Sequence, residues 1–232
     1  MARKKKFVNP EYEESEVDKM AREERERQRG VYNKQKAMMR GKWFFIAFLV
    51  MMLDQITKWA ATELYLKPRL GMGNGMNFFD WLINLPPIIP SGSGFKITSF
   101  LNIVMVWNTG VSFGFLSNFG PYMPYILIGV ACFIIGLFLF WMLQTHDQIQ
   151  GICCALIIGG AFGNIIDRLR FGAVIDFIDM HALGLHWPAY NIADAMIVIG
   201  VGMLIITSFA FDRKTKQRYR KKRQIRRERR GR

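Results

Sequence analysis

The sequence has few cysteines and, over most of its length, few charged residues. Only three of its 232 residues are cysteine, too few for a small fold held together by disulfides. Residues 43–211 carry six basic and eight acidic side chains, although the whole chain has a formal net charge of +14. That stretch is too apolar for an intrinsically disordered chain and too weakly charged for a water-soluble surface. The composition therefore indicates a membrane protein.

The sequence also lacks the short motifs of several enzyme classes. It contains no HExxH, no GxSxG and no P-loop, which argues against the common zinc peptidases, serine hydrolases and nucleotide-binding enzymes. The cysteines lie in apolar runs without a nearby histidine, so we expect them to be small packing residues. A metal site has candidate ligands but no helical ligand spacing, and we expect no metal and no organic cofactor. Those candidate ligands are Asp176, Asp179, His181 and His186.

Four apolar segments are long enough to cross a membrane, or nearly so. They are Trp43–Thr62, Tyr122–Leu143, Gly151–Ile166 and Ala195–Phe211. A helix needs about 20 apolar residues to cross the hydrocarbon, so the last two must include polar residues at one end. Between the first two spans, residues 63–121 contain a Gly/Pro/Asn-rich half and a half with strand-like composition. We predict a mostly α membrane protein with four transmembrane helices and a small β-rich subdomain at the outer face.

The charged residues are concentrated in the two terminal segments. Residues 1–42 hold 13 basic and 8 acidic side chains, and residues 212–232 hold 13 basic and 2 acidic ones. An even number of spans places both termini on one side, and the positive-inside rule makes that side the cytoplasm. The glutamate- and arginine-rich stretch 11–29 predicts a solvated helix. We expect the basic tails to lie on anionic lipid rather than to bind nucleic acid, since no base-stacking motif accompanies the charge.

The acidic residues of the apolar part are the main functional candidates, because a carboxylate near hydrocarbon is costly unless it is paired or protonated. Five of them are predicted to lie at the outer ends of the spans: Asp54, Asp167, Asp176, Asp179 and Asp194. Helical spacing lets Asp54 pair with Lys58, whose ammonium we expect to reach outward to the membrane surface. We also expect the Asp54 carboxylate to accept hydrogen bonds from the loop around Asn108.

Two further patterns sharpen this prediction. Gly159 and Gly163 have a small-xxx-small spacing that allows another helix to approach closely, and Asn164 and Arg168 then offer donors on one helix face. Asn191, three residues before Asp194, stands where an apolar helix begins. This is the spacing of an N-cap residue and its N3 partner, which places a carboxylate in the positive end of the helix dipole.

Four sequence motifs in this order closely resemble the lipoprotein signal peptidase (signal peptidase II) family of bacteria. They are DQITK (54–58), NTGVSFGF (108–115), GGAFGNIIDRLRFGAVIDFID (159–179) and YNIADAMIVIG (190–200). The resemblance implies a membrane aspartic endopeptidase that cuts diacylglyceryl-modified prolipoproteins before the lipidated cysteine. It further implies a location in the bacterial cytoplasmic membrane. We expect a monomer.

The same resemblance implies which residues act. By motif, the catalytic pair is Asp176 and Asp194, while Asp167 is a rival for the first aspartate. The supporting positions implied are Asp54, Lys58, Asn108, Gly110, Asn164, Arg168, Asn191 and Ala193. Two close carboxylates share one proton near neutral pH, so one can activate water while the other acts as an acid. We expect Asp194 to be mainly the ionised partner, since a helix N-terminus favours its charge.

Two alternatives from other functional classes stay open at this point. One is an ion-coupled transporter or channel with a proton relay through Asp54, Lys58 and Asp194. The other is a membrane anchor that holds a nucleic-acid or ribosomal partner through its basic tails.

Overall fold

The structure is a computed structural model that describes residues 15–110 and 122–208. The predicted basic tail, the first 14 residues and the end of the NTGVSFGF motif lie outside these described residues. Two compact units are distinguished, residues 1–39 and residues 40–232, and each is considered by itself. In the first unit, the described residues form the beginning of helix α1 (Glu16–Trp59). Its exposed Arg22 and Glu26 side chains, 3.9 Å apart, confirm the predicted solvated helix with i,i+4 pairs.

The second unit contains the apolar helices. After Trp59 the chain continues as a π-helical segment, η1 (Ala60–Leu66), and a short helix, α2 (Lys67–Arg69). Helices α4 (Met123–Gln144) and α5 (Gln148–Phe171) follow, and a further apolar helix covers Ile192–Ser208, where the described residues end. Three helices are long and apolar enough to cross a membrane, and the fourth is shorter within the described residues. The described residues of the four predicted apolar segments are therefore helical.

Helix α5 is the central helix of the second unit. Its most apolar stretch is 67% buried, whereas that of α4 is only 11% buried, so α4 presents most of its surface outward. Cys153 packs with Ile157 and Leu204 in the interior, as predicted for a small packing residue. Cys132 on α4 is exposed instead, which corrects that prediction for this cysteine.

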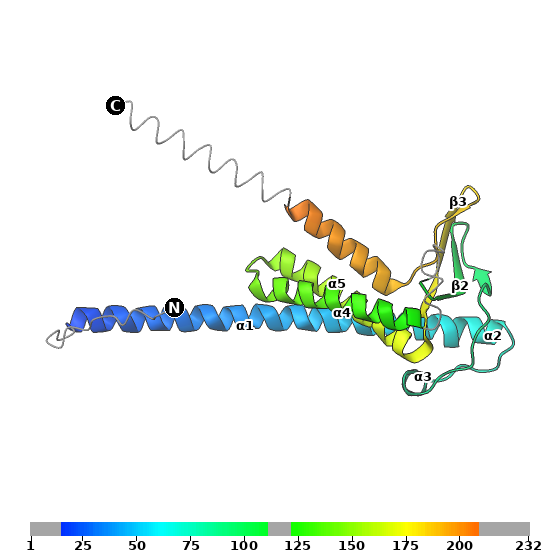
Figure 1. Cartoon of the computed structure of the whole chain (residues 1–232), viewed down its shortest axis with the longest axis horizontal. Coiled ribbons are helices and arrows are strands. Elements are labelled where there is room, and N and C mark those ends of the chain that lie inside the picture. Colours follow the sequence, from blue (N-terminus) through cyan, green and yellow to red (C-terminus); the bar gives the residue numbers. More distant parts are fainter. Residues whose placement is uncertain (1–14, 111–121, 209–232) are drawn as a thin grey trace, which may run out of the picture. The chain divides into compact units, whose positions relative to one another are not determined.

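A small antiparallel sheet combines two strands that precede α4 in the chain with two strands that follow α5. Gly172 ends α5 in the left-handed conformation (φ 70°), where a side chain would be strained, and turns the chain into β3 (Val174–Ala182). Strand order is β1 (Gly94–Lys96), β2 (Leu101–Asn108), β3 and β4 (Leu185–His186). Figure 1 shows this sheet at one end of α4 and α5. We call this end of the unit its sheet end.

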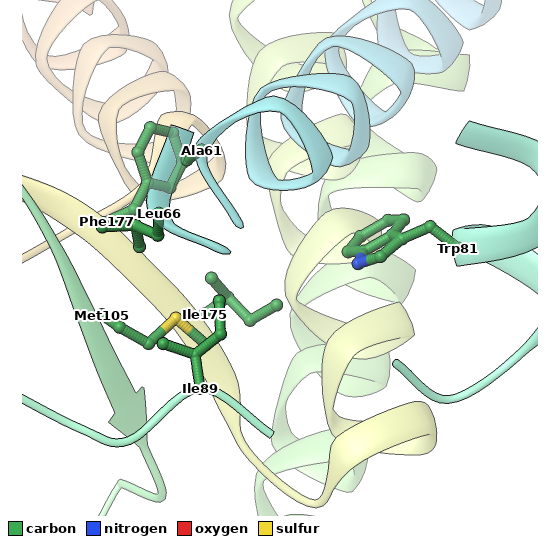
Figure 2. Close-up of a cluster of buried hydrophobic side chains, with 7 residues drawn as sticks. All are labelled: Ala61, Leu66, Trp81, Ile89, Met105, Ile175 and Phe177. Carbon is green, nitrogen blue, oxygen red and sulfur yellow. The ribbon is translucent and has the colours of Figure 1, made fainter. Parts of the chain in front are cut away.

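A buried apolar cluster joins the sheet to the helices at the sheet end. Ile175 and Phe177 of β3 and Met105 of β2 meet Leu66 of η1 there. Figure 2 shows Trp81, from helix α3 (Phe78–Ile83), apart from the other labelled side chains and beside the helix drawn in yellow. The cluster excludes water from one face of the β2–β3 pair, which leaves the other face for polar side chains. That polar face carries the site described next.

Candidate active site

Asp176 stands on β3, with its carboxylate held by two asparagines. Asn191 donates its side-chain amide to Oδ1 at 2.7 Å, and Asn108 donates its amide to Oδ2 at 2.9 Å. The orientation of Asn108 is fixed in turn, because its Oδ1 accepts the backbone N–H of Gly110 at 2.9 Å. Gly110 has a φ of 78°, a conformation that strongly favours glycine. The Asn108–Gly110 turn therefore positions Asp176.

Burial is the main cause of an unusual pKa for Asp176. This residue is 1% exposed. Burial, followed by the negative charge of Asp194, raises the pKa of the Asp176 carboxyl from an ordinary 3.8 to about 7. The hydrogen bonds from Asn108 and Asn191 act in the opposite direction but do not cancel this effect. Asp176 can therefore hold a proton close to neutral pH.

Asp194 lies in the first turn of the helix that starts at Ile192, as the sequence predicts. The Asn191 side chain accepts the Asp194 N–H at 3.0 Å, and the Asp194 carboxylate accepts the Asn191 N–H at 3.4 Å. This reciprocal cap confirms the predicted N-cap and N3 pairing. The other carboxylate oxygen accepts a hydrogen bond from the Asn164 amide at 2.8 Å. Asp194 stays half-buried, so water and substrate can reach it.

Asn164 and Asn191 connect the two aspartates in a continuous hydrogen-bonded chain. Asn191 donates to Asn164 Oδ1 at 3.2 Å as well as to Asp176. Asn164 then donates to Asp194, so the chain runs from Asp176 through two amides to Asp194. Because three separate elements supply these residues, α5, β3 and the last helix are fixed relative to one another at the site.

A buried ionic triad lies beneath this chain. The Lys58 ammonium is 2.7 Å from the Asp54 carboxylate and 2.7 Å from the Asp167 carboxylate, and all three side chains are fully buried. The i,i+4 pair of Asp54 and Lys58 is confirmed. The predicted outward reach of Lys58 is wrong, because two carboxylates hold its ammonium inside. A buried charge needs such partners, since an unpaired one costs several kcal/mol.

Each carboxylate of the triad also fixes a backbone segment of the site. Asp54 accepts the N–H of Ala193 at 2.9 Å, which ties α1 to the helix that carries Asp194. Among the described residues, the donors to Asp54 are Ala193, Lys58 and Gln55 rather than the predicted loop around Asn108, whose residues 111–121 lie outside the described part of the chain. Asp167 accepts the N–H of Ile175 at 3.0 Å and so fixes the residue next to Asp176.

Three glycines of α5 allow the close approach that these contacts need. A Cβ on Gly163 would lie 2.4 Å from Asp54 Oδ2, and one on Gly160 would lie 2.5 Å from the Ala193 carbonyl oxygen. A Cβ on Gly159 would lie 2.4 Å from a backbone carbonyl oxygen of α1. The predicted small-xxx-small contact is thus confirmed, and Gly160 extends it to a second helix.

Arg168 lies beside the site, and among the described residues its guanidinium makes one long hydrogen bond. Its Nη1 donates to the Asn164 carbonyl oxygen at 3.4 Å. Its guanidinium attracts the carboxylates of Asp194, Asp167 and Asp176 electrostatically, and the attraction to Asp194 is the strongest of the three. A half-buried guanidinium here can bind a carbonyl or carboxylate oxygen of a ligand.

The candidate metal ligands are only partly brought together. Asp179, His181 and His186 place one ligand atom each within 4.8 Å of one another, and Asp176 is not in this group. The His181 and His186 rings stack, with centroids 4.9 Å apart and planes at 15°. Asp179 is bound by His186 at 2.9 Å and by Asn102 at 2.7 Å. The lone pairs of the two rings thus lie in nearly parallel planes, an arrangement less favourable for one tetrahedral metal ion than two planes that intersect at the ion.

Sequence reasoning missed several residues that help to build this end of the protein. Gln55 donates to Asp167 at 3.0 Å and to Asp54 at 3.2 Å. Glu63 and Lys67 form a second buried pair, 2.6 Å apart, whose carboxylate also accepts the Met76 N–H. The i,i+4 spacing of this pair was a usable signal, since it repeats the spacing of Asp54 and Lys58.

Comparison with known proteins decides which family this arrangement belongs to. The family model described as signal peptidase (SPase) II, Peptidase_A8, matches residues 46–210, which include every residue of the site. The chain belongs to the signal peptidase II family. The family makes it an aspartic peptidase, a class of enzymes whose chemistry uses two carboxylates.

Curated relatives and solved structures agree with this assignment. A lipoprotein signal peptidase of Aeromonas hydrophila is 34% identical over 176 residues, covering 75% of this chain and 91% of the relative. One from Ralstonia nicotianae is 35% identical and covers 72% of this chain and 83% of the relative. A solved bacterial membrane enzyme, determined by the in meso method at 1.9 Å resolution, matches with a TM-score of 0.54 and 27% identity. That match covers 72% of this chain and 92% of the solved one.

Proposed function

We propose that this signal peptidase II cleaves diacylglyceryl-modified prolipoproteins on the N-terminal side of the lipidated cysteine, with Asp176 and Asp194 as its catalytic pair. Cleavage of signal peptides from prolipoproteins is the activity that the family and its curated relatives carry. One structural observation supports the choice of residues most directly. Two carboxylates are joined through Asn191 and Asn164, and one of them has a pKa of about 7.

The geometry supports a division of roles between the two carboxyl groups. Asp194 lies in the positive end of a helix dipole and accepts a hydrogen bond from Asn164, which favours its ionised form. As a base it takes a proton from the water that attacks the scissile carbonyl carbon. Asp176 enters the reaction protonated and gives its proton to the carbonyl oxygen as the tetrahedral intermediate forms. Collapse of this intermediate breaks the C–N bond, and the leaving nitrogen receives the proton that Asp194 took. One hydroxyl of the intermediate returns a proton to Asp176 as the new carbonyl forms, which restores both carboxyl groups.

Asp167, the rival for the first aspartate, is better explained as a positioning residue. Its oxygens accept from Lys58, Gln55 and the Ile175 N–H, and its side chain is fully buried. No substrate carbonyl can approach it without displacing these donors. Asp167 thus holds β3 so that Asp176 faces Asp194.

Substrate contacts follow from which donors are still available. Asn108 is engaged by both Asp176 and Gly110, so we assign it to positioning rather than to substrate binding. Arg168 keeps donors for a backbone or diacylglyceryl carbonyl oxygen beside Asp194. The acyl chains of the substrate stay in hydrocarbon while its peptide enters from the side.

The membrane arrangement completes the proposal. The chain is a multi-pass membrane protein of a bacterial family. We assign it to the cytoplasmic membrane as a monomer, with both termini in the cytoplasm, where basic tails meet anionic lipid. The sheet end and the two aspartates then face outward, where translocated prolipoproteins emerge.

A cleavage assay with the purified full-length protein tests this function. A synthetic peptide with a diacylglyceryl cysteine is expected to be cut on the N-terminal side of that cysteine, whereas the same peptide without lipid is expected to stay intact. Removal of residues 213–232 is expected to leave the rate unchanged, which separates the peptidase from an anchor that works through its tails. Cleavage without an ion gradient separates it from an ion-coupled transporter. Equal cleavage of the unlipidated peptide would contradict the proposed substrate class.

A further inference from the structure

The segment between η1 and the sheet exposes an unusual amount of apolar surface. Residues 75–90 contain a single ionisable side chain, Asp80. Four large apolar side chains in this segment point outward: Phe79 is 73% exposed, Ile83 80%, Leu85 68% and Ile88 75%. A surface this apolar is costly in water, about 25 cal/mol for each Å² of apolar area.

Helix α3 carries apolar side chains on both of its faces, and its one charged residue, Asp80, is exposed and hydrogen-bonded with Asn77. Trp81 is fully buried, and Phe78 and Leu82 pack against the same cluster of buried side chains. Phe79 and Ile83, four residues apart, share the exposed face. A helix on a water-exposed surface normally has one polar face, whereas the outward side of α3 carries two large apolar side chains beside a single carboxylate. The exposed face of α3 therefore fits the boundary between hydrocarbon and head groups, where Phe79 and Ile83 can meet acyl chains while Asp80 stays in water.

Arg170 fixes the depth of this segment relative to the membrane helices. Its guanidinium donates to the carbonyl oxygens of Trp81 and Asn84, and it lies 4.2 Å from the Trp81 ring centroid. Arg170 belongs to the last turn of α5, a 24-residue helix. At 1.5 Å per residue such a helix is about 36 Å long, which exceeds the roughly 30 Å of hydrocarbon. The last turn of α5, and α3 with it, therefore lies where hydrocarbon meets the head groups.

The apolar surface continues inward from the exposed residues. Leu85 and Ile88 form part of the wall of a cavity of about 430 Å³, with Trp107 and Phe171 among its other lining residues. Figure 1 shows α3 beside the sheet end, next to the yellow end of α5. An acyl chain at this depth would meet both the outer face of α3 and the mouth of this cavity.

We propose that α3 and the loop Leu85–Ile88 form a lipid-binding element that inserts into the leaflet at the sheet end. Its partners are phospholipid acyl chains next to the head groups. The apolar faces of membrane helices and this segment then make one continuous lipid-facing surface, joined through Arg170. This inference does not depend on the proposed peptidase function, because it concerns where the segment lies and not what the site does.

Spin labels placed on this segment test the proposal in a bilayer. The full-length protein is labelled at a single introduced cysteine, Phe79→Cys or Ile83→Cys, in a Cys132→Ala background, and one copy is held in each lipid nanodisc. A separate sample, the unmodified protein labelled at its native Cys132 on α4, serves as the lipid-facing reference. Ser99→Cys, at an exposed polar position near β2, serves as the water-facing control. Collisions with oxygen report hydrocarbon, and collisions with a water-soluble nickel chelate report water.

The proposal predicts that labels at positions 79 and 83 give oxygen-to-nickel collision ratios several-fold above that of the Ser99→Cys control and similar to that of Cys132. Ratios equal to that of Ser99→Cys would overturn it. Protection from both reagents would also overturn it, because another protein segment would then cover the face. A photoreactive phospholipid adds a test on the unmodified chain. Adducts on residues 78–88 are expected, and their absence while α4 is modified would refute the proposal.

Discussion

Replacing Lys58 by methionine tests whether the buried triad acts as one electrostatic unit. The change keeps the apolar length of the side chain but removes the cation that lies 2.7 Å from both Asp54 and Asp167. Two fully buried carboxylates then face each other without a cation between them, although each keeps its neutral hydrogen-bond donors. Breaking a buried pair in this way costs about 3–5 kcal/mol. We therefore expect Lys58→Met to lower the thermal unfolding temperature strongly in detergent micelles.

A second substitution, Asp54→Asn, shows whether the stability effects of the triad residues are coupled. Asp54→Asn keeps an oxygen that can accept the Ala193 N–H, and Lys58 keeps Asp167, so alone it should cost only about 1–3 kcal/mol. In the Lys58→Met background, however, Asp54→Asn removes the charge of one of the two carboxylates that have lost their cation. We expect the double variant to unfold at a higher temperature than Lys58→Met alone, which is a favourable coupling between the two sites.

Lys67→Met is the matched control, since it breaks the other buried i,i+4 pair, that with Glu63. It is expected to lower stability as well, but to reduce the cleavage rate less than Lys58→Met does, because no hydrogen bond within residues 15–110 and 122–208 joins that pair to the aspartates of the site. The reasoning fails if the costs of Asp54→Asn and Lys58→Met simply add. Additive costs would mean that the triad residues do not depend on one another's charge.

Three further predictions concern the site directly. A Cβ at position 163 would lie 2.4 Å from the Asp54 carboxylate, so Gly163→Ala should reduce the cleavage rate at least about tenfold. Gly129→Ala is the control, because a Cβ at that position meets open space and should leave the cleavage rate unchanged. The cleavage rate should fall above about pH 7, because the pKa of Asp176 is raised to about 7 and the carboxyl loses its proton there. Activity that stays undiminished up to pH 9 would contradict the role of Asp176 as the acid. EDTA should leave cleavage intact, whereas loss of activity that zinc restores would favour a metal held by Asp179, His181 and His186.

Local patterns were enough to predict much of the fold and part of the site. Hydrophobic runs located the four helices, because crossing hydrocarbon demands length and apolarity that are read directly from the residues. The Asn191–Asp194 cap and the Asp54–Lys58 pair were also predictable, since each follows from a spacing of three or four residues within one helix. In each of these cases the partners are neighbours in the chain.

Contacts between distant segments were not predictable in the same way. Asp54 binds the N–H of Ala193, 139 positions later in the chain, and no local pattern distinguishes that donor from the loop around Asn108. Lys58 was expected to reach outward because its second carboxylate, Asp167, comes from another helix. The register that places Asn108 opposite Val174 likewise depends on tertiary packing of β2 on β3.

The catalytic pair itself is tested most directly by single-turnover cleavage of the diacylglyceryl peptide by Asp176→Asn and Asp194→Asn. Each substitution keeps the size of the side chain and removes its proton chemistry, so each rate is expected to fall by about 10²–10⁴-fold or more while the protein stays folded. Asp179→Asn, on the same strand but bound to His186, is expected to keep most of the activity. Turnover near the unmodified rate in either Asp176→Asn or Asp194→Asn, with the fold intact, would contradict the two-aspartate account.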